Sequence, residues 1–287
     1  MNSLRKSFSI PSAAIAIALV ASPAGVLSAQ DRDGGLPRPS SSAVAEAQTE
    51  GLDLRRLPVT RGLHIVSLDD SPFVGAMAQQ MRDEIAEQAK AGAYLVEKAK
   101  IPNLRAAINT VKPTRTMSGL LDKRYHSLAD IRPHLRYDPI SVVGTVLDSQ
   151  PMVEATTAGG VTDGRWSGVT RSWDIGGLGF VQLDESEYRE TGGSITLVKE
   201  WLNSDVNGTP ATLKTMRSAD GATLVSISWV TESTDYRLNL QPVHADAVEA
   251  NQRALLDLAT KLGRRTRRVG SVRGMVPRGL SLSPDLP

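Results

Sequence analysis

The chain has 287 residues, a formal net charge of +2 and no cysteine. This length suits one or two domains, and an apolar content of 40% allows a hydrophobic core, although not along the whole chain. The lack of cysteine excludes disulfides, thiolate metal sites, a cysteine nucleophile and a lipid-modified N-terminal cysteine. We therefore expect a fold that is held together by burial of apolar surface alone.

Residues 1–29 have the three-part pattern of a secretory signal peptide. Arg5 and Lys6 supply the positive start, residues 13–20 form an uncharged apolar run, and small residues follow at Ser22-Pro23-Ala24 and Leu27-Ser28-Ala29. The apolar run is too short for a stable membrane span, and the alternative is an uncleaved anchor or a buried N-terminal helix. We expect a periplasmic or secreted protein that is not a lipoprotein and has no transmembrane span after cleavage.

Residues 30–61 are rich in Gly, Pro, Ser and Ala and predict a disordered linker. Residues 62–136 predict a helical segment. Ser71-Pro72 is a typical helix start, and Met77, Met81, Ile85 and Ala89 recur at four-residue spacing, which predicts an amphipathic helix ending near Ile101-Pro102. A shorter helix is predicted over 104–111, and Ser127 with Asp130 forms a predicted capping pair.

Residues 137–263 predict an antiparallel β-sheet of six to seven strands covered by a C-terminal helix, so the expected fold class is α+β. The alternation of apolar and polar residues that is typical of a strand is clearest at Val225, Ile227 and Trp229, which are separated by serines. Asn207-Gly208 and Asp220-Gly221 suit tight hairpin turns. A helix is predicted from His244 to Leu262, before Gly263. The expected strands are 140–147, 165–173, 178–183, 194–202, 210–216, 223–231 and 235–240.

Residues 264–287 predict a disordered basic tail. Removal of residues 1–29, which contain two basic residues and no acidic one, lowers the formal charge from +2 to 0. From Lys261 onward there are seven basic residues and one acidic residue, so this end carries +6 and residues 30–260 carry −6. Arg264, Arg265, Arg267 and Arg268 are candidate contacts to an anionic envelope surface or an envelope protein.

The segment from Val206 to Leu262 resembles a small sheet-plus-helix domain of unknown function found in exported and anti-sigma-factor-like bacterial proteins. The matching residues are Val206-Asn207-Gly208-Thr209-Pro210-Ala211, Ile227-Ser228-Trp229, Tyr236-Arg237-Leu238 and the helix at 255–262. The resemblance implies the order strand–turn–strand–strand–helix. It also implies a sensing or binding module on the envelope side of the membrane, and no particular activity.

No catalytic motif is present. His126 and His134 stand near Asp122, Asp130 and Asp138 without metal-ligand spacing, which favours a polar helical region. Asp184, Glu185 and Glu187 could form an acid/base pair, but such a cluster on a strand is more typical of solvated surface. We expect no cofactor and no bound metal.

All four tryptophans, Trp166, Trp173, Trp201 and Trp229, lie in the predicted sheet. Trp229 is part of an alternation of apolar and polar residues, which predicts that its side chain lies in the hydrophobic core. Trp166 and Trp173 lie in a Gly-rich stretch and are candidates for an exposed binding platform, with core packing as the alternative.

These observations favour a non-catalytic binding or interaction module of the cell envelope. A periplasmic hydrolase with a site assembled from distant residues, and an accessory factor of an envelope or secretion machine acting through its basic tail, are the alternatives. Nucleic acid is not an expected partner.

Overall fold

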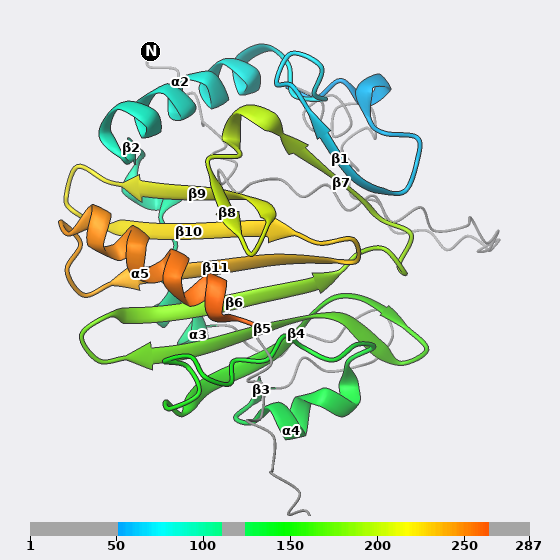
Figure 1. Cartoon of the computed structure of the whole chain (residues 1–287), viewed down its shortest axis with the longest axis vertical. Coiled ribbons are helices and arrows are strands. Elements are labelled where there is room, and N and C mark those ends of the chain that lie inside the picture. Colours follow the sequence, from blue (N-terminus) through cyan, green and yellow to red (C-terminus); the bar gives the residue numbers. More distant parts are fainter. Residues whose placement is uncertain (1–50, 111–123, 264–287) are drawn as a thin grey trace, which may run out of the picture.

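The computed structural model describes residues 51–110 and 124–263 (Figure 1). The predicted signal peptide and the four candidate arginines of the tail lie outside the described residues. The end of the predicted linker is structured, because Asp53 caps the short helix η1 (Leu54–Arg56) and Leu52 bridges Phe73.

A nine-stranded sheet forms the body of the protein, in the order β2-β9-β10-β11-β6-β5-β4-β3 with β8 beside β9. Every neighbouring pair is antiparallel except β2 and β9. The α+β class and the mostly antiparallel sheet are confirmed, and the strand number exceeds the prediction. The bounds are β2 Tyr94–Leu95, β3 Arg124–Tyr125, β4 Met152–Thr162, β5 Arg165–Ile175, β6 Gly179–Glu187, β8 Ser204–Val206, β9 Thr209–Arg217, β10 Thr223–Val230 and β11 Thr234–Pro242.

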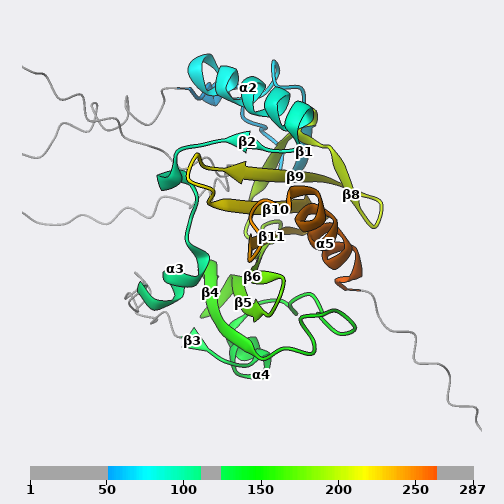
Figure 2. The same cartoon turned by 90° about the vertical axis from the view of Figure 1, so that its left-hand side faces the viewer.

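Helix α5 (Val248–Lys261) covers one face of this sheet, as predicted (Figure 2). Its Leu255 and Leu258 pack with Ile227, Trp229 and their neighbours in the main hydrophobic cluster. The alternation in β10 places these residues on one face because successive side chains of a strand point to opposite faces. Over Val206–Leu262 the structure has the end of β8, a turn, β9, β10, β11 and α5, which is one strand more than the order that the resemblance implies.

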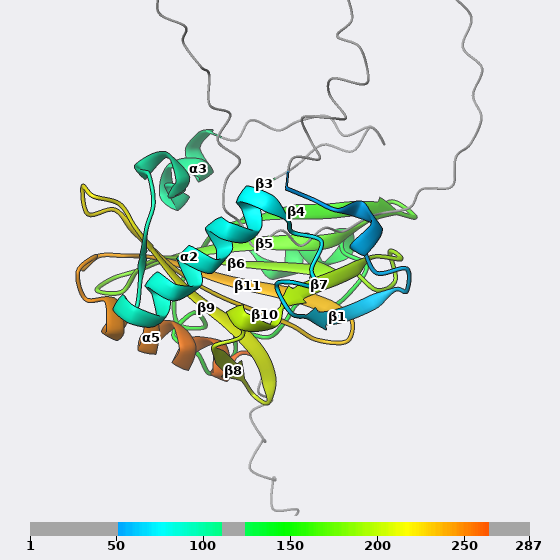
Figure 3. The ribbon, with the colours of Figure 1, turned by 90° about the horizontal axis from the view of Figure 1, so that it is seen from above.

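The opposite face is covered in part by a two-stranded ribbon and by helices. In the ribbon, β1 (Gly62–Val66) pairs in parallel with β7 (Ser194–Val198). Helix α2 (Gly75–Ala91) contributes Ala78 to a second cluster with Tyr94, Val198 and Trp201. Helix α3 (Leu104–Thr110) and α5 lie on opposite sides of the sheet (Figures 2 and 3).

The bounds predicted for the long helix after Ser71 are wrong at both ends. The Ser71 hydroxyl donates to the Leu68 carbonyl (2.7 Å) and accepts from the Phe73 amide (3.2 Å), so it closes a turn before α2 instead of capping it. The helix stops at Gly92, which has a φ of 71°. Tyr94 then joins the large sheet beside Met216, and Lys98–Lys100 form a single turn, η2.

Residues 62–136 are therefore helical only in part, since they also contain β1, β2 and β3. The capping pair is confirmed: the Ser127 hydroxyl accepts from the Asp130 amide (3.1 Å) at the start of α4 (Leu128–Ile131), which continues into η3 (Arg132–His134). Residues 140–147 form turns and no strand, although Leu147 is buried in the main cluster. Within residues 137–263 the prediction missed β4, whose register shifts between Ala158 and Val161, and the short strand β8.

Candidate ligand cavity beneath the parallel ribbon

The face of the large sheet opposite α5 is polar at its centre. Thr212, Ser228, Arg237, Asp184 and Thr170 stand directly opposite one another across β9, β10, β11, β6 and β5. We call these five residues the polar row. Most antiparallel sheets that pack on both sides bury apolar residues at such positions, so a polar row under a covering layer is a candidate functional surface.

At one end of the polar row, hydrogen bonds within the protein satisfy the side chains. The Asp184 carboxylate accepts hydrogen bonds from the Thr170 hydroxyl (2.7 Å), the Gln182 amide (3.0 Å) and the Asn239 amide (3.1 Å). Burial raises the pKa of Asp184, and these hydrogen bonds act in the opposite direction. This network stabilises the centre of the sheet and leaves Asp184 little capacity for a ligand.

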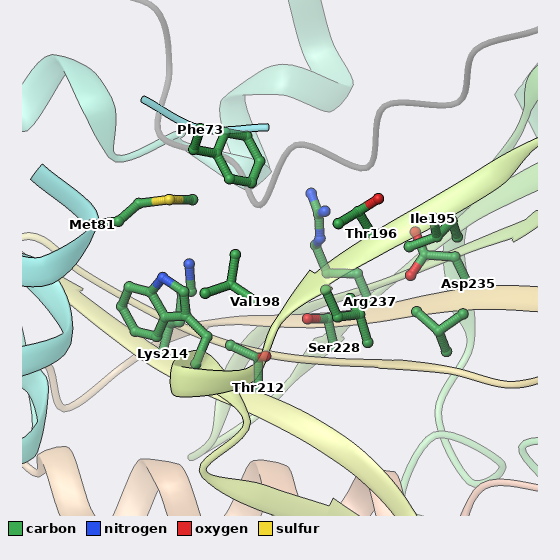
Figure 4. A pocket seen from close by; sticks show the side chains of 13 residues that line it. Phe73, Met81, Ile195, Thr196, Val198, Thr212, Lys214, Ser228, Asp235 and Arg237 are labelled. Atoms are coloured by element: carbon green, nitrogen blue, oxygen red, sulfur yellow. The ribbon is translucent and has the colours of Figure 1, made fainter. Parts of the chain in front are cut away.

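The other end of the polar row opens into a cavity beneath β7, which we call the β7 cavity. Figure 4 shows Lys214 and Arg237 rising from the sheet toward Phe73, Met81 and Thr196. The space open to water-sized groups is about 50 Å³. The polar side chains that line it are Thr196, Thr212, Lys214, Ser228, Asp235 and Arg237, and Trp201 belongs to its apolar wall.

Lys214 is the most unusual group of the cavity. Its Nζ lies 3.6 Å from the centre of the Trp201 ring, a cation–π contact. Burial lowers the pKa of Lys214 to about 8, and the charge of Glu84 acts against this shift. The Trp201 Nε1 is buried and donates to no other described residue. Two hydrogen-bond donors therefore lie side by side without an acceptor from the described chain.

Asp235 lies at the other end of the cavity. Burial raises the pKa of Asp235 to about 6, and the charge of Arg237 acts against this shift. Within the described residues, the side chains of Thr196, Thr212, Lys214, Ser228 and Asp235 make no hydrogen bond or ion pair to another side chain or backbone group. Asp184 differs from these residues, because it lies on the same face of the sheet and its carboxylate accepts three hydrogen bonds.

The structure does not bring the predicted candidate residues together. Trp166 and Trp173 are 8% and 2% exposed, so the prediction that they form an exposed platform is wrong. Both pack in hydrophobic clusters, since their side chains point into the interior on β5. Arg264, Arg265, Arg267 and Arg268 lie outside the described residues.

The prediction that the carboxylates near Tyr188 are solvated is also wrong. Glu185 and Glu187 are buried on the α5 side of β6, and Glu185 pairs with Arg171. His126 bonds the Val153 carbonyl (2.9 Å) and His134 contacts the Tyr125 ring, so these histidines serve local packing. Across residues 51–110 and 124–263, no three His, Asp or Glu side chains are placed to share a metal ion.

Sequence reasoning missed the cavity because its residues come from α2, β7, β9, β10 and β11, from the loop before α2 and from the turn after β7. The one available signal was the β10 alternation, which puts Ser226 and Ser228 on the face opposite the core. No family model, no curated protein and no solved structure matches this chain. None of the described helices is long and apolar enough to cross a membrane.

Proposed function

We propose that this chain is a non-catalytic binding module of the cell envelope and that it recognises its ligand at the β7 cavity. The observation that carries the proposal is the set of cavity side chains that have no hydrogen-bond partner in the described chain. The Trp201 indole N–H beside them is buried without an acceptor, whereas Thr196, Lys214, Ser228 and Asp235 are half-buried. A buried donor without a partner costs free energy, so a fold retains it where it serves another purpose. Binding of a ligand group would supply the missing partners.

The size of the cavity limits what it can hold. About 50 Å³ is room for a few water molecules, whereas sites for whole small molecules measure roughly 300–1,000 Å³. The cavity therefore suits one terminal group of a larger ligand. The rest of that ligand would lie outside, along the half-buried parts of Ser228 and Arg237.

The envelope location rests on the predicted signal peptide. It is tested by determining the N-terminus of the protein in the periplasmic fraction. A mature chain that begins after Ala24 or Ala29 is expected. Intact Met1 in a cytosolic fraction would contradict export.

Native mass spectrometry of the chain purified from its own cell envelope tests the binding function. We expect a bound species that the Lys214→Met variant retains at least tenfold less well. Lys199→Met is the matched control, since Lys199 is exposed and lies two residues from Trp201 in η4 (Lys199–Trp201). Equal loads of bound species on both variants, or none on the wild-type chain, would contradict the proposal.

A hydrolase that uses the same cavity is the second candidate. A lysine whose pKa lies near 8 is suited to act as a general base, and Lys214 and Ser228 lie on adjacent strands of the same face. Turnover of a simple activated ester such as p-nitrophenyl acetate, lost in both Lys214→Met and Ser228→Ala, would favour this candidate. Equal rates for these variants and Lys199→Met would exclude the cavity as its site.

A further inference from the structure

We infer that the ligand group held in the β7 cavity is an oxyanion, bound by the Lys214 ammonium and the Trp201 indole N–H. This inference rests on the proposed function and names the chemistry of the ligand. A carboxylate, a sulfate ester and a phosphate ester share this chemistry.

The argument begins with the balance of donors and acceptors. A lysine ammonium offers three donors and no acceptor, and an indole N–H is a donor only. The hydroxyls of Thr212 and Ser228 can donate as well. A ligand group that satisfies this end of the cavity must therefore bring acceptor atoms, and several of them on one group.

The charge of Lys214 gives the second step. Burial disfavours the Lys214 ammonium when no counter-charge is near, and the cation–π contact with Trp201 offsets only part of that cost. The carboxylate whose charge acts on Lys214 is Glu84, and its Oε1 already accepts from the Gln80 amide (2.7 Å). A negative ligand group would supply the counter-charge in direct contact.

Asp235, the carboxylate that lines the cavity, is too distant to fill this role. It stands opposite Val230 on β10, whereas Lys214 stands opposite Ser226. Strand spacing and rise put their Cα atoms roughly 16 Å apart. The charge of Arg237 acts on both groups: it opposes the effect of burial on the pKa of Asp235, and it lowers the pKa of Lys214 further.

The test uses the indole N–H resonances of the ¹⁵N-labelled chain. Sodium sulfate and sodium acetate are titrated against sodium chloride at equal ionic strength, and Trp201→Phe assigns the Trp201 signal. We expect a saturable shift of that signal with sulfate, acetate or both, and the stronger of the two distinguishes a tetrahedral from a planar oxyanion. In Lys214→Met the affinity falls at least tenfold, while Lys199→Met binds as the wild type does.

The same titration at pH 9 separates ion pairing from general salt effects. Neither probe changes its protonation between pH 7 and pH 9. The protonated fraction of a group with a pKa near 8 falls about tenfold over that range, so the affinity falls by about the same factor. Chloride gives the same small, linear shift at both pH values.

Three results would overturn the inference: a Trp201 shift that chloride reproduces, a sulfate affinity that Lys214→Met retains, and an affinity independent of pH. Should Lys214→Met fail to fold, Lys214→Gln and the chloride comparison still decide. A bound species from the envelope without any sulfate or acetate binding would reject the oxyanion and keep the proposed function. If no bound species is found and neither sulfate nor acetate binds, the oxyanion and the proposed function are both rejected.

Discussion

Arg171 and Glu185 form a fully buried ion pair, with Nη2 2.5 Å from Oε1 and the residues 1% and 2% exposed. Both groups also form hydrogen bonds to the backbone of one further residue, Ile140. The Ile140 amide donates to Glu185 Oε2 (2.7 Å), and Arg171 Nη2 donates to the Ile140 carbonyl (2.7 Å). The pair thereby fastens the turns around residue 140, which lack sheet hydrogen bonds of their own, to β5 and β6.

Glu185→Leu is expected to lower the free energy of unfolding by about 3–5 kcal/mol, because it leaves the Arg171 charge buried without a partner. Urea unfolding at pH 7 measures the loss. The double variant Arg171→Met with Glu185→Leu removes both charges and should recover most of it. A double variant as unstable as the single one would show that the hydrogen bonds to Ile140, and not the unpaired charge, dominate.

Lys214→Met is expected to stabilise the fold by about 1–3 kcal/mol at pH 7, since an ammonium with a lowered pKa is disfavoured in the folded state. Between pH 8 and 10.5 the folded wild-type chain has lost this proton and the unfolded chain keeps it. The stability of the wild type therefore rises relative to the variant over this range. Urea unfolding at pH 7 and pH 9.5 tests both points. A variant less stable than the wild type at pH 7 would mean that Lys214 is a structural residue.

Asp235→Asn should stabilise the protein at pH 7 by about 1–3 kcal/mol, because the burial that raises the pKa of Asp235 to about 6 disfavours its charged form. The folded state holds this proton more tightly than the unfolded state. The free-energy cost of the buried Asp235 charge is therefore absent below about pH 4 and complete above about pH 6. Thermal unfolding from pH 4 to pH 8 should show the two proteins diverging as the pH rises. Parallel curves would contradict the assignment.

Gly179→Ala is expected to destabilise the fold by about 2–4 kcal/mol. Gly179 has a φ of 132°, and a Cβ there would collide with the Gln241 carbonyl oxygen, where β6 pairs with β11. Gly176→Ala is the matched control, since a Cβ at that position meets no atom within 4 Å. Its effect should stay within about 0.5 kcal/mol. Similar losses for the two variants in urea unfolding would refute the close approach of the two strands.

The sequence predicted well where a strand is apolar on one side. In β10, Val225, Ile227 and Trp229 alternate with serines, and the period of two identifies both the strand and its buried face. In α5 the apolar residues recur at helical spacing and end before Gly263. Such patterns are local consequences of burial on one side, so they can be recognised without knowledge of the partner.

The prediction failed where pairing partners are remote. The helix predicted to end near Ile101-Pro102 includes Tyr94, yet Tyr94 pairs with Met216 more than a hundred residues later. β4 contains Gly159 and Gly160 and lies between the predicted strands 140–147 and 165–173, yet pairing with β5 makes it a strand. Residues 140–147 are rich in β-branched residues, but Arg171 and Glu185 hold Ile140, and the Thr145 hydroxyl closes a turn by donating to the Val142 carbonyl (2.6 Å).

By itself, the sequence determined the α+β class, the late antiparallel strands and the helix that covers them, because these follow from residues close together in the chain. Only the tertiary structure decided which charged groups are buried. Glu185 finds its counter-charge on a neighbouring strand, while Lys214 meets the ring of Trp201 and no carboxylate. The free energy of a buried charge depends on what surrounds it in three dimensions, and neighbours in sequence do not specify those surroundings.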